Sequence, residues 1–332
     1  MESIYYVLCW LCHRSCEHCY DERFRPYHDA DLRHVVEEAR AAFPRVIANL
    51  PARMTWRDAG GVERIGRIIL AGGEVLLEPV REPVLYPAIG LLQEKYRPQG
   101  GIKLVIQTTG DTLSPRLVRE LRERGVWMIS VSGLDEYHTG IEPAVLEPKL
   151  AGLFAAEGLA PFDGDWAAPP GSGPFYHFFG ATPDSWIGRL WPRGRAWRNG
   201  LSTAGIEDNF CNRWSGGLHF LRYRDAGSEV SIDPSGAVYP CCIKTRRPIG
   251  SLLDENLYSL LERLAGHPVY EAISAGQPQR MGLSHGWTEE RFLAESTVTL
   301  PSGQVYRNLC IGCDRFHEAV LMPELVCIAP AS

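Results

Sequence analysis

The sequence predicts an α/β fold built mainly on parallel strands. Short apolar segments with the character of strands alternate with segments of helical spacing, and polar or glycine-rich turns follow the strands. The residues suited to chemistry collect in those turns. Because the carboxyl ends of parallel strands form the active face of such folds, we expect the functional site at that edge of the sheet.

Each predicted element rests on a local pattern. Apolar runs define the strands and the spacing of apolar residues defines the helices, while a Ser N-cap, a following Pro and Gly125 bound the helix over 114–124. The predicted strands are 3–10, 67–71, 102–107, 126–131 and 175–180, and the predicted helices are 31–43, 83–96, 114–124 and 144–157. Residues 49–61 are predicted to be irregular, residues 158–173 to form a loop, and residues 229–239 to form a hairpin around Pro234-Ser235-Gly236.

Composition narrows the function classes. The 332 residues carry a net charge of −6, which argues against a DNA-binding surface. The apolar stretch over residues 4–12 is too short to cross a bilayer and lacks the signals of a secretory leader, so we expect neither a membrane anchor nor export. Without export, the ten cysteines suit metal ligation or redox chemistry better than disulfides.

The first group of cysteines has the spacing C-x3-C-x2-C. Cys12, Cys16 and Cys19 follow the first predicted strand, with no obvious fourth partner nearby. Three thiolates on one short loop suit a 4Fe-4S cluster in which one iron has no protein ligand. A zinc knuckle or a redox-sensing loop is the alternative at this spacing.

With Gly72-Gly73-Glu74 at the end of a predicted strand, this triplet resembles the radical S-adenosylmethionine (SAM) superfamily. The C-terminal half is similar to the twitch/SPASM group of that superfamily, through residues 236–241, residues 249–252 and the pair Cys310 and Cys313. The resemblance implies a partial (β/α)6 TIM-like barrel, the radical SAM core, over residues 1–205. A small α+β auxiliary-cluster domain over residues 206–332 would follow.

The resemblance also implies how SAM is held. The cluster on Cys12, Cys16 and Cys19 would bind the amino and carboxylate groups of SAM through its open iron. Glu74 and its strand edge would hold the methionine ammonium, and His18 would pack near the adenine. The implied SAM contacts are His18, Gly72, Gly73, Glu74, Thr108, Ser132 and Asp135. The sequence departs from the family pattern where Thr109 replaces Asn and where Gly133 is inserted.

A twitch arrangement implies one auxiliary 4Fe-4S cluster. Its ligands would be Cys211, Cys241, Cys310 and Cys313. Cys242 is the alternative to Cys241, and Cys9 and Cys327 are expected to be buried thiols rather than ligands. The auxiliary cluster would accept an electron from a substrate radical, and the alternative is that it serves only as a structural staple.

These features predict a radical SAM oxidoreductase that cleaves SAM reductively to a 5′-deoxyadenosyl radical, which abstracts hydrogen from a small-molecule substrate. Residues 186–200 hold three Trp, four Arg and no acidic residue, which suits an anionic substrate, although an interdomain loop explains the segment as well. Four histidines, His138, His177, His219 and His317, are interpreted as structural, and no acid–base residue is assigned.

Two other functions remain open. One is a maturase that oxidises or cross-links a side chain of a short peptide or protein. The other is a non-enzymatic metal-binding or electron-carrier protein, against which the intact Gly72-Gly73-Glu74 argues. An enzyme of the predicted kind implies an external electron donor such as flavodoxin or ferredoxin. The oxygen lability of its clusters implies a cytoplasmic location.

Overall fold

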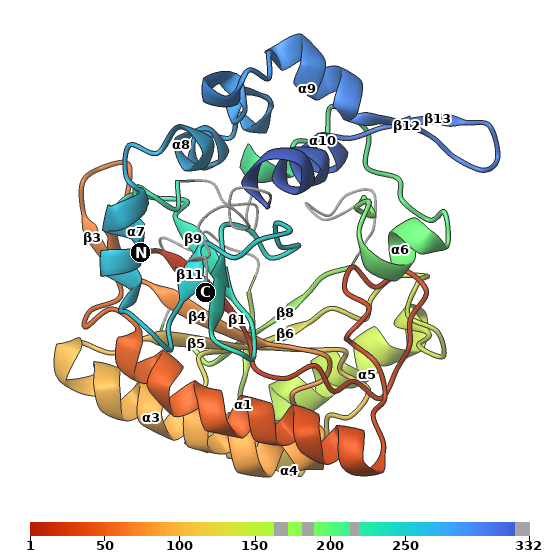
Figure 1. The fold of residues 1–332 in the computed structure, drawn as a ribbon. Helices are drawn as coiled ribbons and strands as arrows, with labels where there is room; N and C mark the ends of the chain where they lie inside the picture. Colours follow the sequence, from red (N-terminus) through yellow and green to blue (C-terminus); the bar gives the residue numbers. More distant parts are fainter. Residues whose placement is uncertain (163–171, 181–188, 213–218, 323–332) are drawn as a thin grey trace.

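A nine-stranded sheet runs through the protein in the order β11-β10-β9-β1-β4-β5-β6-β8-β7 (Figure 1). The computed structural model describes residues 1–162, 172–180, 189–212 and 219–322. The strands are β1 (Ser3–Val7), β4 (Arg67–Ala71), β5 (Lys103–Thr108), β6 (Met128–Val131), β7 (Ala160–Pro161), β8 (Phe175–Phe178), β9 (Glu229–Ile232), β10 (Ala237–Tyr239) and β11 (Gly250–Ser251). Two small antiparallel sheets pair β2 (Thr55–Arg57) with β3 (Glu63–Ile65) and β12 (Thr297–Thr299) with β13 (Val305–Arg307).

The central strands are parallel, which confirms the predicted fold class. Strand β1 pairs in parallel with both β4 and β9, and the parallel pairing continues from β4 through β5 and β6 to β8. Strands β10 and β11 add antiparallel pairs at one end. Within the described ranges the sheet ends at β7 and β11 and does not close, as expected for a partial barrel.

Helices lie on both sides of this sheet. Figure 1 shows α1, α3, α4 and α5 along one face, with α8, α9 and α10 gathered on the opposite side. The helices are α1 (Asp29–Asn49), α2 (Glu78–Val80), α3 (Tyr86–Tyr96), α4 (Pro115–Glu123), α5 (Pro143–Ala156), α6 (Gly194–Arg198), α7 (Leu257–Leu264), α8 (Pro268–Ser274), α9 (Glu289–Glu295) and α10 (Leu309–Phe316). Short 3-10 or π turns are η1 (Arg81–Leu85), η2 (Arg97–Gln99), η3 (Phe210–Asn212), η4 (Pro278–Arg280), η5 (Leu283–His285) and η6 (His317–Leu321).

Most predicted elements are confirmed, with shifts at their ends. The Ser114 side chain accepts a hydrogen bond from the Leu117 amide at 3.3 Å, so the predicted N-cap of α4 is correct. Helix α1 continues past the predicted end because Pro44 is tolerated inside it. The irregular segment over 49–61 was predicted wrongly, since it contributes β2 to a hairpin whose Trp56 side chain is buried. Most of the predicted loop over 158–173 lies outside the described residues.

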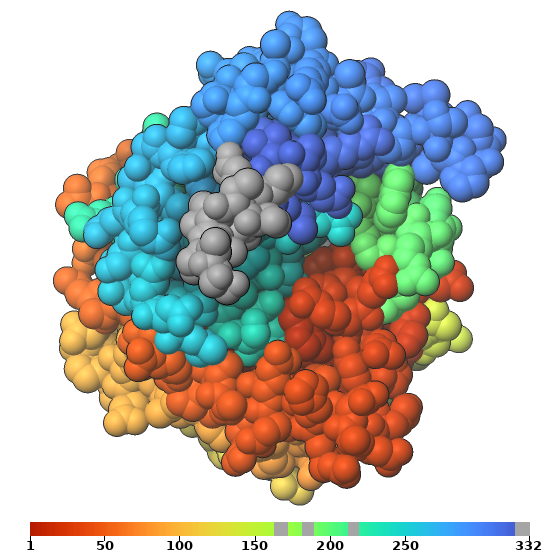
Figure 2. Space-filling view, viewed as in Figure 1, coloured from red at the N-terminus to blue at the C-terminus, as the bar shows by residue number. Residues whose placement is uncertain are grey.

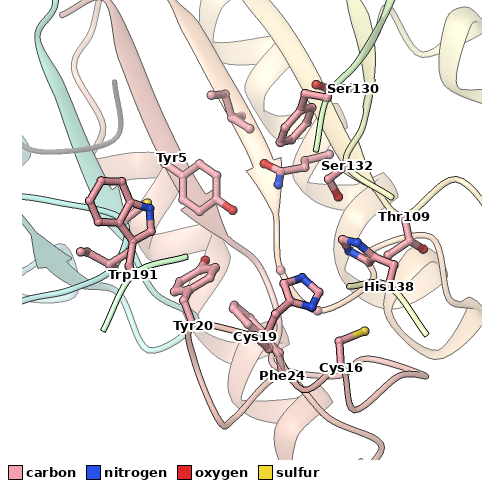
Figure 3. Close-up of a pocket in the computed structure, with 18 of the residues that line it drawn as sticks. Tyr5, Cys16, Cys19, Tyr20, Phe24, Thr109, Ser130, Ser132, His138 and Trp191 are labelled. Atoms are coloured by element: carbon pink, nitrogen blue, oxygen red, sulfur yellow. The ribbon is translucent and has the colours of Figure 1, made fainter. Parts of the chain in front are cut away.

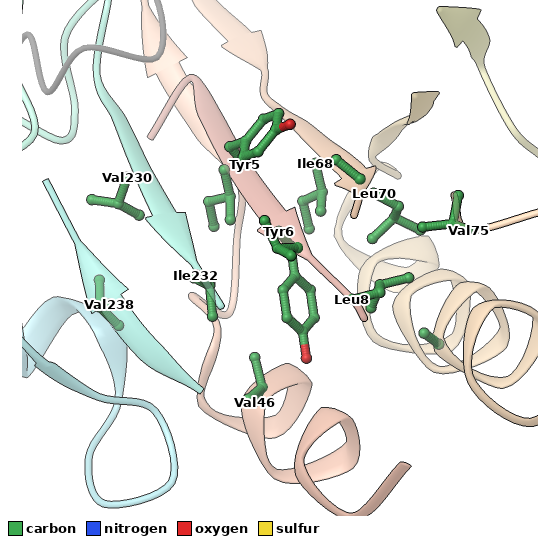
Figure 4. Close-up of a cluster of buried hydrophobic side chains, with 14 of the residues drawn as sticks. Tyr5, Tyr6, Leu8, Val46, Ile68, Leu70, Val75, Val230, Ile232 and Val238 are labelled. Atoms are coloured by element: carbon green, nitrogen blue, oxygen red, sulfur yellow. The ribbon is translucent and has the colours of Figure 1, made fainter. Parts of the chain in front are cut away.

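The alternation of side chains along β1 separates the core from the site. Tyr6 points toward Val46 of α1 and is buried in the main hydrophobic core (Figure 4). Tyr5 leaves the strand on the opposite face and lines a cavity. Because successive residues of a strand alternate between faces, β1 packs the core with one face and lines the cavity with the other. No helix among the described residues is long and apolar enough to span a membrane.

Candidate functional site

A cavity of about 480 Å³ lies on the inner face of the parallel strands and reaches their carboxyl ends. Strands β1, β4, β5, β6, β8 and β9 all contribute lining residues, as do the N-terminal cysteine loop and the segments around Trp191 and Cys242. Figure 3 shows aromatic side chains on one side of this space and Ser130, Ser132 and Thr109 on the other. One end of the cavity therefore lies at the expected position of the site, at the carboxyl ends of the strands.

The cysteine triplet lies on the loop between β1 and α1. All three cysteines line the cavity, and Cys12 and Cys16 are buried. Burial raises the pKa of Cys12 to about 12 and that of Cys19 to about 11, so these thiols would stay protonated without a cation beside them. A bound metal deprotonates such thiols outright, so three cysteines at one cavity wall fit an iron–sulfur cluster.

Arg195 of α6 holds this loop by hydrogen bonds to its backbone. Its guanidinium donates to the carbonyl of Cys16 at 2.8 Å and to that of Phe24 at 2.8 Å. Its backbone amide donates to the carbonyl of Cys19, also at 2.8 Å. The fold therefore fixes the backbone between the second and third cysteines before any cluster is bound.

Gly72 and Gly73 are required by the cysteine loop itself. A Cβ on Gly73 would collide with the carbonyl of Leu11 and would lie 2.7 Å from the Cys12 Cβ, and a Cβ on Gly72 would lie 2.7 Å from the carbonyl of Cys9. The Gly73 amide donates to the carbonyl of Cys9 at 3.1 Å. Both glycines line the cavity, so they let the loop approach the end of β4 closely.

Glu74 is held by hydrogen bonds from within the protein. Its carboxylate is buried and accepts hydrogen bonds from the Thr108 hydroxyl at 2.8 Å, the Thr109 hydroxyl at 2.8 Å and the Thr109 amide at 2.9 Å. The Leu76 amide donates to it as well, at 3.1 Å. Neither Glu74 nor Thr108 lines the cavity, whereas Thr109 does. The Glu74 and Thr108 side chains thus join the ends of β4 and β5, and their expected contacts with SAM stay predictions.

Glu74→Gln is expected to destabilise the protein by about 1 to 3 kcal/mol, because one carboxylate oxygen becomes an amide donor that faces other donors. The midpoint of thermal unfolding should fall by about 1 to 4 degrees, at roughly 1.5 degrees per kcal/mol for a chain of this length. Glu63→Gln, at an exposed position of β3, is the matched control and should leave the midpoint unchanged. An unchanged midpoint for both variants would contradict the role given to Glu74.

His18, Asp135 and His138 come together at the cavity. The Nδ1 atom of His138 lies 2.7 Å from Asp135 Oδ1, and the His18 and His138 rings are 4.6 Å apart. Burial lowers the pKa of His18 to about 4, so its ring is neutral at pH 7. The Asp135 carboxylate also accepts from two backbone amides of its own turn. Ser132, the remaining implied SAM contact, lines the cavity beside them.

The second group of cysteines surrounds a separate small cavity of about 20 Å³. Its lining includes Cys211, Cys241, Cys310 and Cys313, all four of the predicted auxiliary ligands. Cys242 lines the larger cavity instead, so the two adjacent cysteines face different sites. Burial raises the pKa of Cys241 to about 12 and that of Cys310 to about 11, which again fits thiols that a metal would deprotonate. Cys327 lies outside the described residues.

A buried arginine accompanies this second group. Arg193 lines the small cavity and forms an ion pair with Asp314 at 2.9 Å. It also donates to the carbonyl of Cys310 at 3.3 Å. Burial alone would lower the pKa of Arg193, but Asp314 and the nearby cysteines raise it, so the guanidinium stays charged.

The arginines of the Trp- and Arg-rich segment serve contacts within the protein. Arg193 and Arg195 are bound as described, Arg198 pairs with Glu22 at 2.6 Å, and Arg189 lies 3.9 Å from Asp208. These contacts favour the interpretation of the segment as a loop between two parts of the chain. Trp186 lies outside the described residues.

An ion pair joins the two cysteine-bearing regions. Lys244, shortly after Cys241, lies 2.9 Å from Asp21, which follows the triplet, and both side chains are largely buried. Burial alone would raise the pKa of Asp21, but Arg23 and Lys244 outweigh it and lower that pKa from 3.8 to about 2. Ionised Asp21 therefore stabilises the folded state above pH 4, and this stabilisation is lost as the pH falls toward 2.

The variants Lys244→Met and Asp21→Asn should each lower the free energy of unfolding at pH 7, and a double-mutant cycle should give a coupling of about 1 to 3 kcal/mol. Below pH 4, the difference between Asp21→Asn and the unchanged protein should shrink. Thermal unfolding of the four proteins measures both effects. Strict additivity of the two changes would show that the pair contributes nothing.

Several cavity residues were not predicted as site residues. The strands contribute Tyr5, Gln107 and Ser130 to the cavity lining. His177, which was expected to be structural, also lines the cavity. His138, given the same interpretation, also lines it. The available signal was the two-residue alternation along each strand, since Gln107 lies two residues before Thr109 and Ser130 two before Ser132.

Comparisons with known proteins find similarity only among solved structures. No protein-family model matches the sequence, and no curated protein matches it. The crystal structure of BtrN in complex with AdoMet and 2-DOIA is 16% identical, covers 83% of this chain and 88% of that chain, and superposes with a TM-score of 0.45. Native anSMEcpe with bound AdoMet and Cp18Cys peptide is 14% identical, with 98% of each chain covered and a TM-score of 0.45. SuiB from Streptococcus suis, bound to S-adenosylmethionine, is 10% identical, with 82% of this chain and 67% of that chain covered and a TM-score of 0.38.

The chain has the architecture that the resemblance to the radical SAM superfamily implies. Its parallel sheet is open, the cysteine triplet follows the first strand, and Gly72-Gly73-Glu74 follows the neighbouring strand β4. The triplet and the two glycines meet at one cavity.

Proposed function

We propose that the protein is a radical SAM oxidoreductase. The observation that carries the proposal is the meeting of Cys12, Cys16, Cys19 and the Gly72–Gly73 edge at one cavity. The cysteines would hold a 4Fe-4S cluster that binds SAM. When bound, the cluster and SAM supply a 5′-deoxyadenosyl radical that abstracts hydrogen from a substrate.

The residues around the cavity would hold and orient SAM. The neutral His18 ring offers a flat face to the adenine, and Ser132 and Asp135 offer hydroxyl and carboxylate groups to the ribose. Thr109 takes the place that Thr108 was expected to fill, because only Thr109 lines the cavity. Gly72 and Gly73 keep the cysteine loop close to the strand ends.

We further propose that Cys211, Cys241, Cys310 and Cys313 hold one auxiliary 4Fe-4S cluster. Their common small cavity supports this assignment, because it brings together four thiols from distant parts of the chain, as a cubane cluster requires. The auxiliary cluster would accept an electron from the substrate, which makes the net reaction an oxidation. The proposed division is a core over residues 1–205 and an auxiliary domain over residues 206–332.

The size of the cavity favours a small substrate. Its volume of about 480 Å³ lies in the lower part of the range for a single small-molecule ligand, and SAM must share it. The room left suits a small metabolite better than a peptide, so a peptide-modifying maturase is the second candidate. The protein would work in the cytoplasm with an external electron donor such as flavodoxin or ferredoxin.

The direct test is SAM cleavage by the reconstituted protein under anaerobic conditions. With dithionite as reductant, the protein should convert SAM to 5′-deoxyadenosine and methionine, and it should not do so without reductant. Liquid chromatography with mass spectrometry measures both products. Intact SAM in the presence of a loaded and reduced cluster would contradict the proposal and favour the non-enzymatic electron carrier.

A further inference from the structure

The inner face of the sheet carries a row of neutral polar side chains beneath the proposed SAM site. Gln107 of β5 is paired with Ser130 of β6, and Ser130 with His177 of β8, so the three lie at one level on adjacent strands. All three line the cavity. Thr109 and Ser132, near the proposed SAM site, lie two residues further along, which places the row about 7 Å deeper.

This row, hereafter the polar row, offers both donors and acceptors. The amide of Gln107 and the hydroxyl of Ser130 can each donate and accept. The Nδ1 atom of His177 lies 3.3 Å from the carbonyl oxygen of Phe162, which can only accept, so Nδ1 carries the proton and Nε2 is the acceptor of the ring. Burial lowers the pKa of His177, so the ring is neutral at pH 7. The polar row therefore presents hydrogen-bonding groups without charge.

The opposite wall of the cavity is aromatic. Tyr5, Tyr20 and Trp191 lie across from Ser130 and Ser132 in Figure 3, and all of them line the cavity. Aromatic ring faces pack well against the C–H face of a small ring or chain. A ligand between the two walls would have a polar edge toward the polar row and an apolar face toward Tyr5 and Tyr20.

The arginines of the cavity wall have partners within the protein. The Arg195 guanidinium donates hydrogen bonds to backbone carbonyls of the cysteine loop. The other pairs are Arg14 with Asp111 at 2.5 Å, Arg67 with Glu2 at 3.5 Å and Arg189 with Asp208 at 3.9 Å. Each guanidinium already has a counter-charge or carbonyl partners. An anionic substrate is therefore not required to neutralise the positive charge of the cavity wall.

The carboxylates of the wall are compensated in the same way. Asp135 accepts hydrogen bonds from His138 and from two backbone amides. Glu229, at the start of β9, faces the positive charge of Arg67; it raises the pKa of Arg67, although burial is the larger effect and lowers it. A cationic substrate is therefore not required to neutralise these carboxylates. An additional buried positive charge would have no negative partner in the wall.

We propose that the substrate is a small uncharged molecule with hydroxyl, carbonyl or amide groups along one edge. Those groups bind Gln107, Ser130 and His177, and the apolar face of the molecule packs on Tyr5 and Tyr20. This inference rests on the proposed function, because it assumes that SAM occupies the end of the cavity beside the cysteine triplet. It replaces the anionic substrate that the arginine-rich segment suggested.

The test uses deuterium transfer to 5′-deoxyadenosine. The probe is a low-molecular-mass metabolite extract of cells grown in heavy water, separated by ion exchange into cationic, anionic and uncharged fractions, with a deuterated tryptic peptide pool as a fourth sample. Each sample is incubated with the reconstituted holoenzyme, SAM and dithionite in ordinary water. Abstraction breaks a C–D bond of the substrate and forms a C–D bond at the 5′ carbon, which mass spectrometry detects. Deuterium is expected from the uncharged fraction.

Variants connect the result to the polar row. Gln107→Leu and Ser130→Ala should each lower deuterium transfer about tenfold or more, while iron content and SAM affinity stay unchanged. Gln304→Leu makes the same chemical change at an exposed position and should have no effect. Deuterium from a charged fraction or from peptides, or from no sample while SAM is still cleaved, would overturn the proposal. Absence of SAM cleavage in the unchanged protein would overturn the proposed function instead.

Discussion

Replacement of Cys12 by alanine is expected to abolish SAM cleavage and to remove about four iron atoms from each chain. Cys12 lines the cavity together with Cys16 and Cys19, and its Cβ lies against Gly73 at the end of β4. Two remaining thiolates would hold a cubane cluster poorly. Iron analysis and the yield of 5′-deoxyadenosine measure the two effects.

Cys9→Ala is the matched control for this variant. Cys9 is as deeply buried as Cys12 and lies on the same segment, but it does not line the cavity, and its thiol lies 3.8 Å from the carbonyl of Val35. The control should keep its iron and its activity. Equal loss of iron in both variants would show that the effect comes from disturbed packing, and retention of full activity by Cys12→Ala would remove this residue from the cluster.

The second large effect is expected at two adjacent cysteines that face different cavities. Cys241→Ala should remove about four iron atoms and leave the SAM-binding cluster intact. Cys242→Ala should retain about eight, because Cys242 lines the larger cavity and Cys241 the smaller one. Iron analysis, with electron paramagnetic resonance of the reduced protein, distinguishes the two outcomes.

The two variants control for each other, since each removes one sulfur from neighbouring positions, Cys241 being buried and Cys242 half-buried. The opposite pattern, with iron lost only from Cys242→Ala, would exchange their roles. Loss of iron from neither variant would contradict an auxiliary cluster on this group of cysteines. In that case, the four cysteines would only pack α10 against the segment after β10.

The sequence was sufficient for the features that depend on local pattern. Apolar runs and helical spacing predict β4, β5 and β6 and the helices α1, α3, α4 and α5, and the Ser114 cap of α4 is found where expected. The C-x3-C-x2-C spacing and the Gly-Gly-Glu element predict which residues meet at the strand ends. Each of these signals spans only a few residues, so it can be read from the local sequence.

Features that depend on contacts between distant segments could not be predicted in the same way. Whether Glu74 faces a ligand or the protein depends on Thr108 and Thr109, which belong to another strand. Which of Cys241 and Cys242 faces the other cysteines depends on the turn after β10. The parallel pairing of β9 with β1 joins residues more than two hundred positions apart, and no local pattern indicates it.

We expect the two groups of cysteines to hold two iron–sulfur clusters in each chain. Iron and acid-labile sulfide are to be determined for each chain after anaerobic reconstitution. About eight of each per chain is the predicted result. About four of each would leave a single cluster and contradict the auxiliary site. Zinc in place of iron would contradict both iron–sulfur clusters and the proposed radical chemistry.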